Sequence, residues 1–182
     1  MPDGPKVPSP QRSALFGRGR PLEITLLLRP HVGGGQFDLT GPVARDIVVN
    51  ALLSQGYRHP TKHGDIAHLR AHTRPLGFLL DDVVNVVRVP RMAAKFVTQD
   101  HSLYIAPIGP YAGGGEQVLI EAHGESGEIA GLAVADALQR AMPVMLQHAT
   151  LEVGHWSQSK KVLWTAVAMG ARTGNVPNPS EE

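Results

Sequence analysis

The chain has 182 residues, of which 42% are hydrophobic and 18% are charged, and its formal net charge at pH 7 is +1. This composition is sufficient for a core in one domain or two small ones, and the near-balanced charge does not by itself demand a nucleic acid or an anionic membrane as partner. Cysteine is absent, which excludes disulfides, thiolate catalysis and cysteine-ligated zinc or iron–sulfur sites.

Residues 1–20 combine regularly spaced prolines with lysine and arginine and contain one acid, Asp3. They predict an extended basic arm, which is either a flexible tail or an arm that orders on a partner surface. The segment lacks the apolar centre of a signal peptide, and no run in the chain is long enough to span a bilayer. We therefore expect no membrane partner.

The first regular elements are a strand and a helix. Leu22 to Leu28 begins with an alternation of apolar and polar residues, which is typical of a strand. Pro42 then occupies the first position of a helix, a place that suits its fixed backbone angle. The apolar stripe of this helix recurs every three or four residues as far as Leu52, and Gly56 ends it.

Residues 58–74 are rich in arginine, lysine and histidine. His68 and His72 are four positions apart, which on a helix would place both rings on one face, where they could bind a metal. The segment lacks the glutamate of the H-E-x-x-H motif, and an arginine lies between the two histidines, so no metal site is predicted. The composition instead indicates a basic face, either solvated or turned toward a polyanion such as DNA. The residues expected on it are Arg58, Lys62, His68, Arg70, His72 and Arg74.

Short strands are expected over residues 78–80, 83–89 and 101–106, with a helical turn or two over 92–97. The prolines and glycines of residues 107–115 then predict a hinge or a long connection. This is the expected boundary between two halves of the chain, although the two halves could share one sheet.

The C-terminal part has the pattern strand, helix, strand, strand. Residues 116–123 are an apolar run typical of a buried strand, and Ser126 stands at the N-cap position of an amphipathic helix that Pro143 is expected to end. Residues 148–153 alternate in the manner of a half-buried strand. Residues 162–168 are predicted as a further strand, with apolar side chains on both faces.

These elements together predict an α+β protein with a mixed or antiparallel sheet and helices packed on one face. The expected organisation is an arm, an N-terminal α+β half, a C-terminal strand-helix-strand-strand unit and a tail. The corresponding ranges are 1–20, 21–110, 116–171 and 172–182.

The last predicted strand indicates a contact between subunits. One helix can bury only one of its two apolar faces, so the other face must meet either the N-terminal half or a neighbouring subunit. The polar turn before this strand carries two lysines that would border such a contact. The residues expected at this interface are Trp156, Lys160, Lys161 and Trp164.

Residues 123–127 approach the nucleophile elbow of hydrolases, in which a serine occupies a strand-to-helix turn. That signature requires a glycine where Glu128 stands, and helix capping explains Ser126. We therefore expect no catalytic residue, no cofactor and no bound metal. A small hydrolase that uses Ser126 and His123 remains an alternative.

The C-terminal unit resembles the tail-terminator proteins of long-tailed bacteriophages. The resemblance rests on a strand at 117–122, an alanine-rich helix at 127–142, the segment 150–156 (TLEVGHW), a polar turn and a basic-flanked strand at 160–169. It implies a non-enzymatic neck protein that forms a ring, a hexamer, which caps the tail tube and joins it to the head. The implied partners are further copies of the chain, the neighbouring tail-tube and head-completion proteins, and DNA contacted without sequence specificity. The implied location is the virion, with assembly in the host cytoplasm.

Residues 21–107 are similar to the propeptides of sedolisin-type serine peptidases. Residues 21–29 (PLEITLLLR) resemble the opening strand of those propeptides, and later segments could complete a ferredoxin-like order of elements. Those segments are 65–78, 85–89, 93–96 and 102–105. This second resemblance implies a stand-alone folding assistant or peptidase inhibitor.

Overall fold

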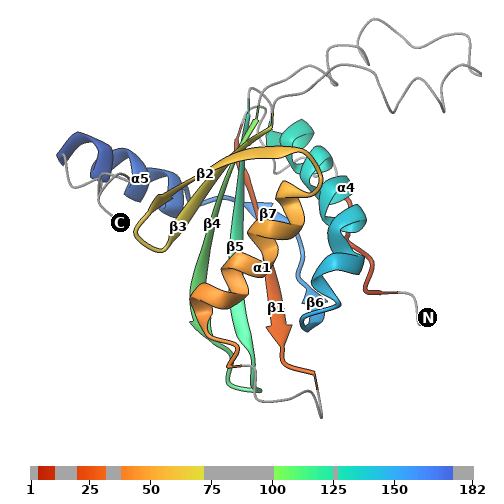
Figure 1. Cartoon of the computed structure of the whole chain (residues 1–182). Helices are drawn as coiled ribbons and strands as arrows, with labels where there is room; N and C mark the ends of the chain where they lie inside the picture. The colour runs from red at the N-terminus through yellow and green to blue at the C-terminus, as the bar shows by residue number, and fades with distance from the viewer. Residues whose placement is uncertain (1–3, 11–19, 32–37, 72–100, 125–126, 174–182) are drawn as a thin grey trace, which may run out of the picture.

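The computed structural model describes residues 4–10, 20–31, 38–71, 101–124 and 127–173. Within these residues the chain forms strands that build one sheet and helices that cover it (Figure 1). In chain order the elements are β1 (Leu22–Arg29), α1 (Gly41–Leu53), β2 (Tyr57–His63), β3 (Ile66–Ala71), β4 (His101–Pro110), β5 (Glu116–Gly124), α4 (Gly127–Met145), β6 (Thr150–Val153), β7 (Ser157–Gln158) and α5 (Val162–Thr173).

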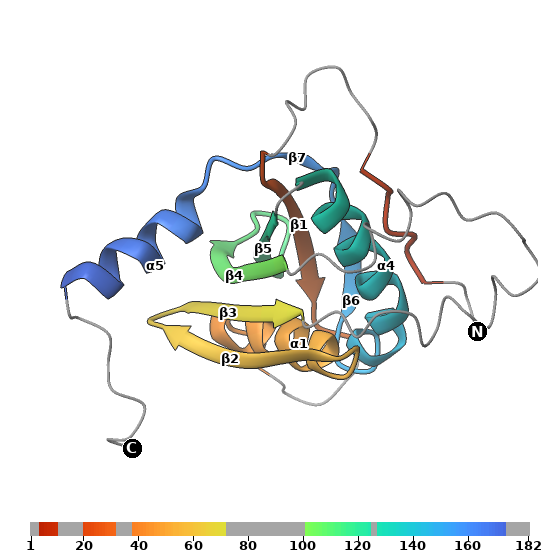
Figure 2. The same cartoon turned by 90° about the horizontal axis from the view of Figure 1, so that it is seen from above.

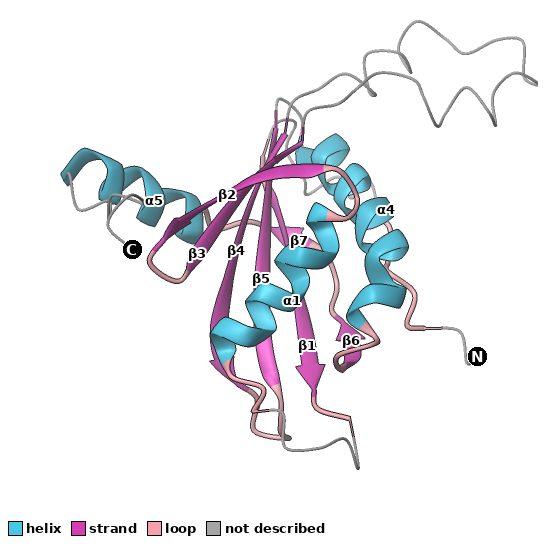
Figure 3. Ribbon diagram, viewed as in Figure 1, coloured by secondary structure: helices cyan, strands magenta, loops and turns pink. Residues whose placement is uncertain are grey.

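The sheet has the strand order β2-β3-β4-β5-β1-β6, and the short β7 pairs with the start of β1. Every strand pair in the described part of the chain is antiparallel. β1, from the N-terminal half, lies between β5 and β6, which come from the C-terminal unit (Figure 3). Both halves therefore contribute to one sheet, and the predicted α+β class is confirmed.

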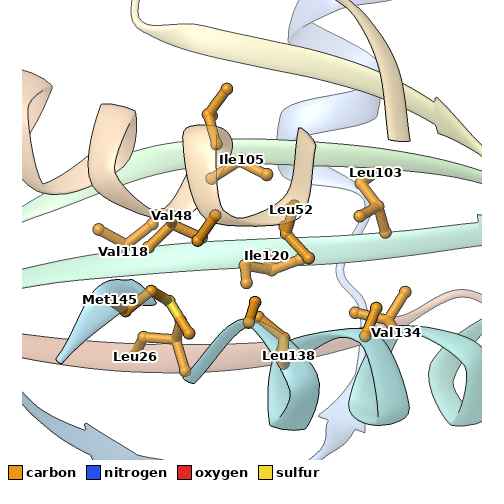
Figure 4. Packing of buried hydrophobic residues seen from close by; sticks show 14 of the residues in the cluster. Leu26, Val48, Leu52, Leu103, Ile105, Val118, Ile120, Val134, Leu138 and Met145 are labelled. Atoms are coloured by element: carbon orange, nitrogen blue, oxygen red, sulfur yellow. The ribbon is translucent and has the colours of Figure 1, made fainter. Parts of the chain in front are cut away.

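The main core lies between the sheet and the helices α1 and α4, which pack beside each other on one face (Figures 1 and 2). Successive side chains of a strand point to opposite faces, so alternate residues of each strand enter this core. Leu26 and Ile120 of the sheet meet Val48 of α1 and Leu138 of α4 there (Figure 4). Full burial of such a side chain contributes about 1.5–3 kcal/mol, and this cluster therefore stabilises the fold.

Residues 162–168, predicted as a strand, belong to α5, so that prediction was wrong. The run contains one polar residue, Thr165, and periodicity cannot separate a buried strand from a helix in such a run. Alanine, which recurs in α5, and the single Met169 favour a helix. α5 lies on the face of the sheet opposite α1 and α4 (Figure 2), where Leu163 and Val167 pack against Tyr104 and Ala106.

Residues 4–10 lie along α4 of their own chain. The Val7 amide donates a hydrogen bond to Gln139 Oε1 at 2.8 Å, and Val7 is buried. Trp156 Nε1 donates to the Pro8 carbonyl at 2.7 Å. This part of the predicted basic arm is therefore anchored within the chain. Arg20 is exposed at the start of the next described segment.

The predicted hinge at residues 107–115 is instead a β-hairpin. β4 continues through Pro107 to Pro110, with a register shift between Pro107 and Gly109, and β5 begins at Glu116. Tyr111 donates its amide to the Gly115 carbonyl at 2.9 Å and closes the turn. The stretch therefore joins two paired strands.

Two smaller expectations also differ from the structure. Pro143 lies inside α4, which continues to Met145, and the polar segment after Trp156 contains the short strand β7. The strands predicted at 78–80 and 83–89, the helical turn at 92–97 and the N-cap at Ser126 lie outside the described residues. α5 includes residues 172 and 173, and the rest of the predicted tail is likewise outside.

Candidate functional site

The face of the sheet that carries α5, which we call the α5 face, presents a row of polar side chains. The strand register pairs Arg58 of β2 with Arg70 of β3, Arg70 with Ser102 of β4, and Ser102 with His123 of β5. Side chains directly opposite each other on paired strands point to the same face. These four residues therefore form a continuous line across the sheet, which we call the arginine row.

A ladder of rings runs beside the arginine row. His68 and Tyr104 are stacked, with ring centroids 4.6 Å apart, and Tyr104 meets the edge of His123 at 5.1 Å. On α5, Trp164 is stacked with His123 at 6.2 Å, and Lys161 Nζ lies 6.0 Å from the Trp164 ring centre. Aromatic contacts at these distances are favourable beyond their buried area. The ladder thus connects β3 with α5.

Glu121 is a fully buried carboxylate, at 0% exposure, that holds the start of α5. It accepts hydrogen bonds from the backbone amides of Leu163 at 3.0 Å and Trp164 at 3.2 Å. His123 Nε2 lies 3.2 Å from the same carboxylate. First-turn amides have no partner within their own helix, so the β5 carboxylate acts as a cap supplied by the sheet. Burial raises the pKa of Glu121, but the hydrogen bonds from His123, Leu163 and Trp164 outweigh it and leave that pKa below its ordinary value.

Two rings of the ladder, His68 and Tyr104, have pKa values shifted toward their neutral forms. Burial lowers the pKa of His68, and the neighbouring Arg70, His63 and His123 lower it further. Burial likewise raises the pKa of Tyr104. His68 therefore adds no positive charge to this face at neutral pH.

The outer side of α5 is apolar and exposed. Val162, Ala166 and Met169 follow one another at i, i+4 and i+7, which places them on one side of the helix. Val162 is 57% exposed and Met169 is 61% exposed. We call these three residues the outer stripe. Trp164, which lies on another side of α5 and stacks with His123, is 43% exposed.

The residues predicted at an interface have different roles in the structure. Trp164 is on the surface of α5, as described above. Trp156 packs against the main core and binds the Pro8 carbonyl, so it anchors residues 4–10 within the chain. Lys160 donates its amide to Glu23 Oε2 at 3.2 Å, and Lys161 has a positive φ of 58°. The two lysines thus belong to the exposed segment that leads into α5.

The residues predicted to face a polyanion are split between the two faces of the sheet. Arg58 and Arg70 lie in the arginine row, whereas Lys62 lies on the other face, 3.9 Å from an Asp46 carboxylate oxygen. His68 is on a strand rather than on a helix, and His72 and Arg74 lie outside the described residues. Sequence reasoning missed Ser102 and His123 as neighbours of the arginines. The alternation within 101–106 and 116–123 could have placed both on this face.

The described residues assemble no catalytic triad. His123 is oriented by Glu121, as a catalytic histidine would be, but in the described part of the chain it has no hydrogen bond to a serine hydroxyl. Ser126 lies outside that part. No group of three or more histidines and carboxylates among the described residues could hold a metal ion.

Comparison of the chain with protein-family models, curated proteins and solved structures finds no match. Among the described residues, no helix has the length and apolar character required to cross a membrane.

Proposed function

We propose that this chain is a non-enzymatic assembly subunit of the phage neck or tail-terminator type. It forms a ring, hexameric by the resemblance of the C-terminal unit, that joins the tail tube to the head in the virion. The chain would assemble in the host cytoplasm together with its tail-tube and head-completion partners. The observation that carries the proposal is the outer stripe of α5.

A surface helix ordinarily has one apolar stripe and a polar opposite side. α5 has two apolar sides, and among the described residues only the side with Leu163 and Val167 packs on the sheet. Fully burying a valine or methionine side chain contributes about 1.5–3 kcal/mol. Burial of Val162 and Met169 by a neighbour would therefore favour association. A neighbouring copy that covers the outer stripe would gain this free energy.

The other large exposed apolar side chains indicate where the neighbour makes contact. In the described part of the chain, besides those of α5, they are Ile108, Tyr111 and Leu132. Ile108 and Tyr111 share the β4–β5 hairpin, which is a separate surface from α5 (Figure 1). A contact between two different surfaces of identical subunits is head-to-tail, and such contacts form a ring when the rotation from one copy to the next closes. We therefore place the α5 outer stripe of one copy against the hairpin of the next.

The test is the oligomeric state of purified protein, measured by light scattering after size exclusion and by negative-stain imaging. Wild-type protein should form closed rings. The double variant Val162→Glu/Met169→Glu places two charges in the contact and should be a folded monomer, as should Ile108→Glu. Leu132→Glu is the matched control, because it changes an exposed apolar residue on α4, outside the contact, and should keep the ring.

Mixing the variants tests the head-to-tail geometry directly. The Val162→Glu/Met169→Glu chain keeps an intact hairpin, and the Ile108→Glu chain keeps an intact α5. Their mixture has one functional contact and should give heterodimers without rings. A monomeric wild-type protein, or a Leu132→Glu variant that dissociates like the others, would overturn the proposal.

A further inference from the structure

Arg58 and Arg70 form a pair of like charges that the fold does not neutralise. They are directly opposite each other on β2 and β3, and both side chains are exposed. Like charges at such positions destabilise strand pairing. Within the described part of the chain, neither arginine makes an ion pair. A bound anion would remove this repulsion.

Elsewhere in the described strands and in α1 and α4, each lysine and arginine has an acid beside it. The pairs are Arg29 with Glu152, Arg45 with Asp46, Lys62 with Asp46 and Arg140 with Asp136. The acids of the α5 face are already engaged, because Glu121 binds the α5 amides and Glu23 binds the Lys160 amide. Among the residues that the structure describes, the absence of an acid beside Arg58 and Arg70 is therefore a local feature of the arginine row.

The donors of the row suit phosphate. Guanidinium groups bind phosphate oxygens through paired hydrogen bonds, and the Ser102 hydroxyl, next in line after Arg70, supplies a further donor. From Arg58 to His123 the row crosses three strand intervals, or about 14 Å at the usual strand spacing. A single small anion would occupy one interval, whereas an extended backbone with repeating phosphates would follow the whole row.

The row ends at rings on which bases can stack. His123 leads to Trp164, which is 43% exposed, and Lys161 lies over the same indole ring. A cationic track beside an exposed aromatic ring is the arrangement by which proteins hold single-stranded nucleic acid, with the phosphates on the track and the bases on the ring.

We propose that the arginine row binds the phosphate backbone of single-stranded nucleic acid and that Trp164 stacks on its bases. All the residues involved belong to one chain, so the site does not depend on ring assembly. A strand laid along the row would contact Arg58, Arg70 and Ser102 in turn and reach α5 beyond His123.

The test measures binding of a fluorescein-labelled single-stranded oligonucleotide by fluorescence polarisation, as a function of salt. Binding should weaken linearly in log–log form as salt rises, because each bound phosphate releases counterions. Arg70→Gln should bind roughly tenfold more weakly, with a salt slope lower by about 0.7, the value for one phosphate of a single strand. Lys62→Gln is the matched control: it removes one charge from the same hairpin on the opposite face, and its affinity should equal that of the wild type.

Equal losses of oligonucleotide affinity in Arg70→Gln and Lys62→Gln would show that binding depends on the total charge of the protein, and would overturn the proposed site. A wild-type protein that fails to bind at low salt would do the same. A duplex of the same length should bind more weakly than the single strand, since its bases are unavailable to Trp164, and equal affinity for the duplex would overturn the stacking. The oligomeric state of each variant, measured in parallel, should match the wild type, so a failure of this site is distinguishable from a failure of assembly.

Discussion

Glu121→Gln is the substitution that most directly tests how α5 is held. Glutamine has nearly the same shape as glutamate but a single acceptor oxygen. Glu121 accepts the amides of Leu163 and Trp164 on separate oxygens, Oε1 and Oε2. In the variant, one of these amides would face the glutamine NH2 group, and two donors cannot bond to each other.

The expected loss follows from these bonds. A hydrogen bond to a charged group contributes about 1.5–3 kcal/mol, and a buried donor left without a partner costs about 1–3 kcal/mol. We therefore expect Glu121→Gln to lower the free energy of unfolding by about 2–4 kcal/mol at neutral pH. For a domain whose total stability is about 5–15 kcal/mol, this is a large fraction.

The same bond network makes the effect dependent on pH. The pKa of Glu121 in the folded chain lies below its ordinary value of 4.5. A carboxylate of this kind stabilises the fold above the unfolded pKa, and the contribution is lost as the pH falls through the folded pKa. The stability difference between wild type and Glu121→Gln should therefore be full at neutral pH and should shrink below pH 4.5.

Urea unfolding followed by far-UV circular dichroism and tryptophan fluorescence measures this difference. Glu23→Gln is the control, because Glu23 is opposite Glu121 in the sheet and accepts the Lys160 amide, but on a partly exposed carboxylate. Glu23→Gln should lower the free energy of unfolding by less than about 1 kcal/mol. The reasoning fails if Glu121→Gln has the same urea midpoint as the wild type. It also fails if the difference in the free energy of unfolding between the two proteins is unchanged in acid.

Two further substitutions test other parts of the fold by the same assay. Trp156→Phe removes the hydrogen bond to Pro8 and should lower the free energy of unfolding by about 1 kcal/mol. Residues 4–10 should also be cleaved faster by a protease. A variant that resists the protease as well as the wild type does would show that other contacts hold this segment. Gly115→Ala should destabilise by more than about 1 kcal/mol, because Gly115 has a φ of 99° and a Cβ would collide with the Leu28 carbonyl. Gly114→Ala, with a φ of 86° but open space around it, should cost less, and an equal cost would refute the steric argument.

The elements with a clear period could be predicted from the sequence. β1 and α1 lie where the alternation and the helical stripe placed them, and Pro42 is in the first turn of α1. β5 and α4 likewise match the predicted strand and helix, apart from the extension of α4 past Pro143. In these segments most polar residues lie on the side away from the main core, so the period is visible.

α5 and β3 were missed for opposite reasons. The run at 162–168 has one polar residue, so no period could be read from it. In β3 the period was present, since Ala67, Leu69 and Ala71 alternate with His68 and Arg70, but the spacing of the histidines suggested a helix instead. A strand prediction would have placed Arg70 on the same face as His68, but the register shift between Arg58 and Thr61 that sets Arg58 opposite Arg70 is not visible in the sequence pattern.

The cap on α5 could not be predicted, because it joins Glu121 to amides 42 and 43 residues away. Alternation within β5 places Glu121 on the other face of the sheet from Ile120 and Ala122, which is the α5 face. Nothing in the sequence says which hydrogen-bond donor Glu121 meets there. Sequence patterns determine the face on which a side chain lies. Its partner depends on how the chain returns, and here that return runs through β7 and the left-handed Lys161.

Glu121 also links the two proposed surfaces. Its carboxylate binds the first turn of α5, which carries Val162 and Trp164, and it contacts His123 at the end of the arginine row. If Glu121 fixes the direction of α5, its loss displaces both the outer stripe and the stacking ring. Glu121→Gln should therefore weaken ring assembly and oligonucleotide binding together, whereas Val162→Glu/Met169→Glu affects the first and Arg70→Gln the second. A Glu121→Gln protein that keeps both properties would show that packing of Leu163 and Val167 on Tyr104 and Ala106 is sufficient to orient α5.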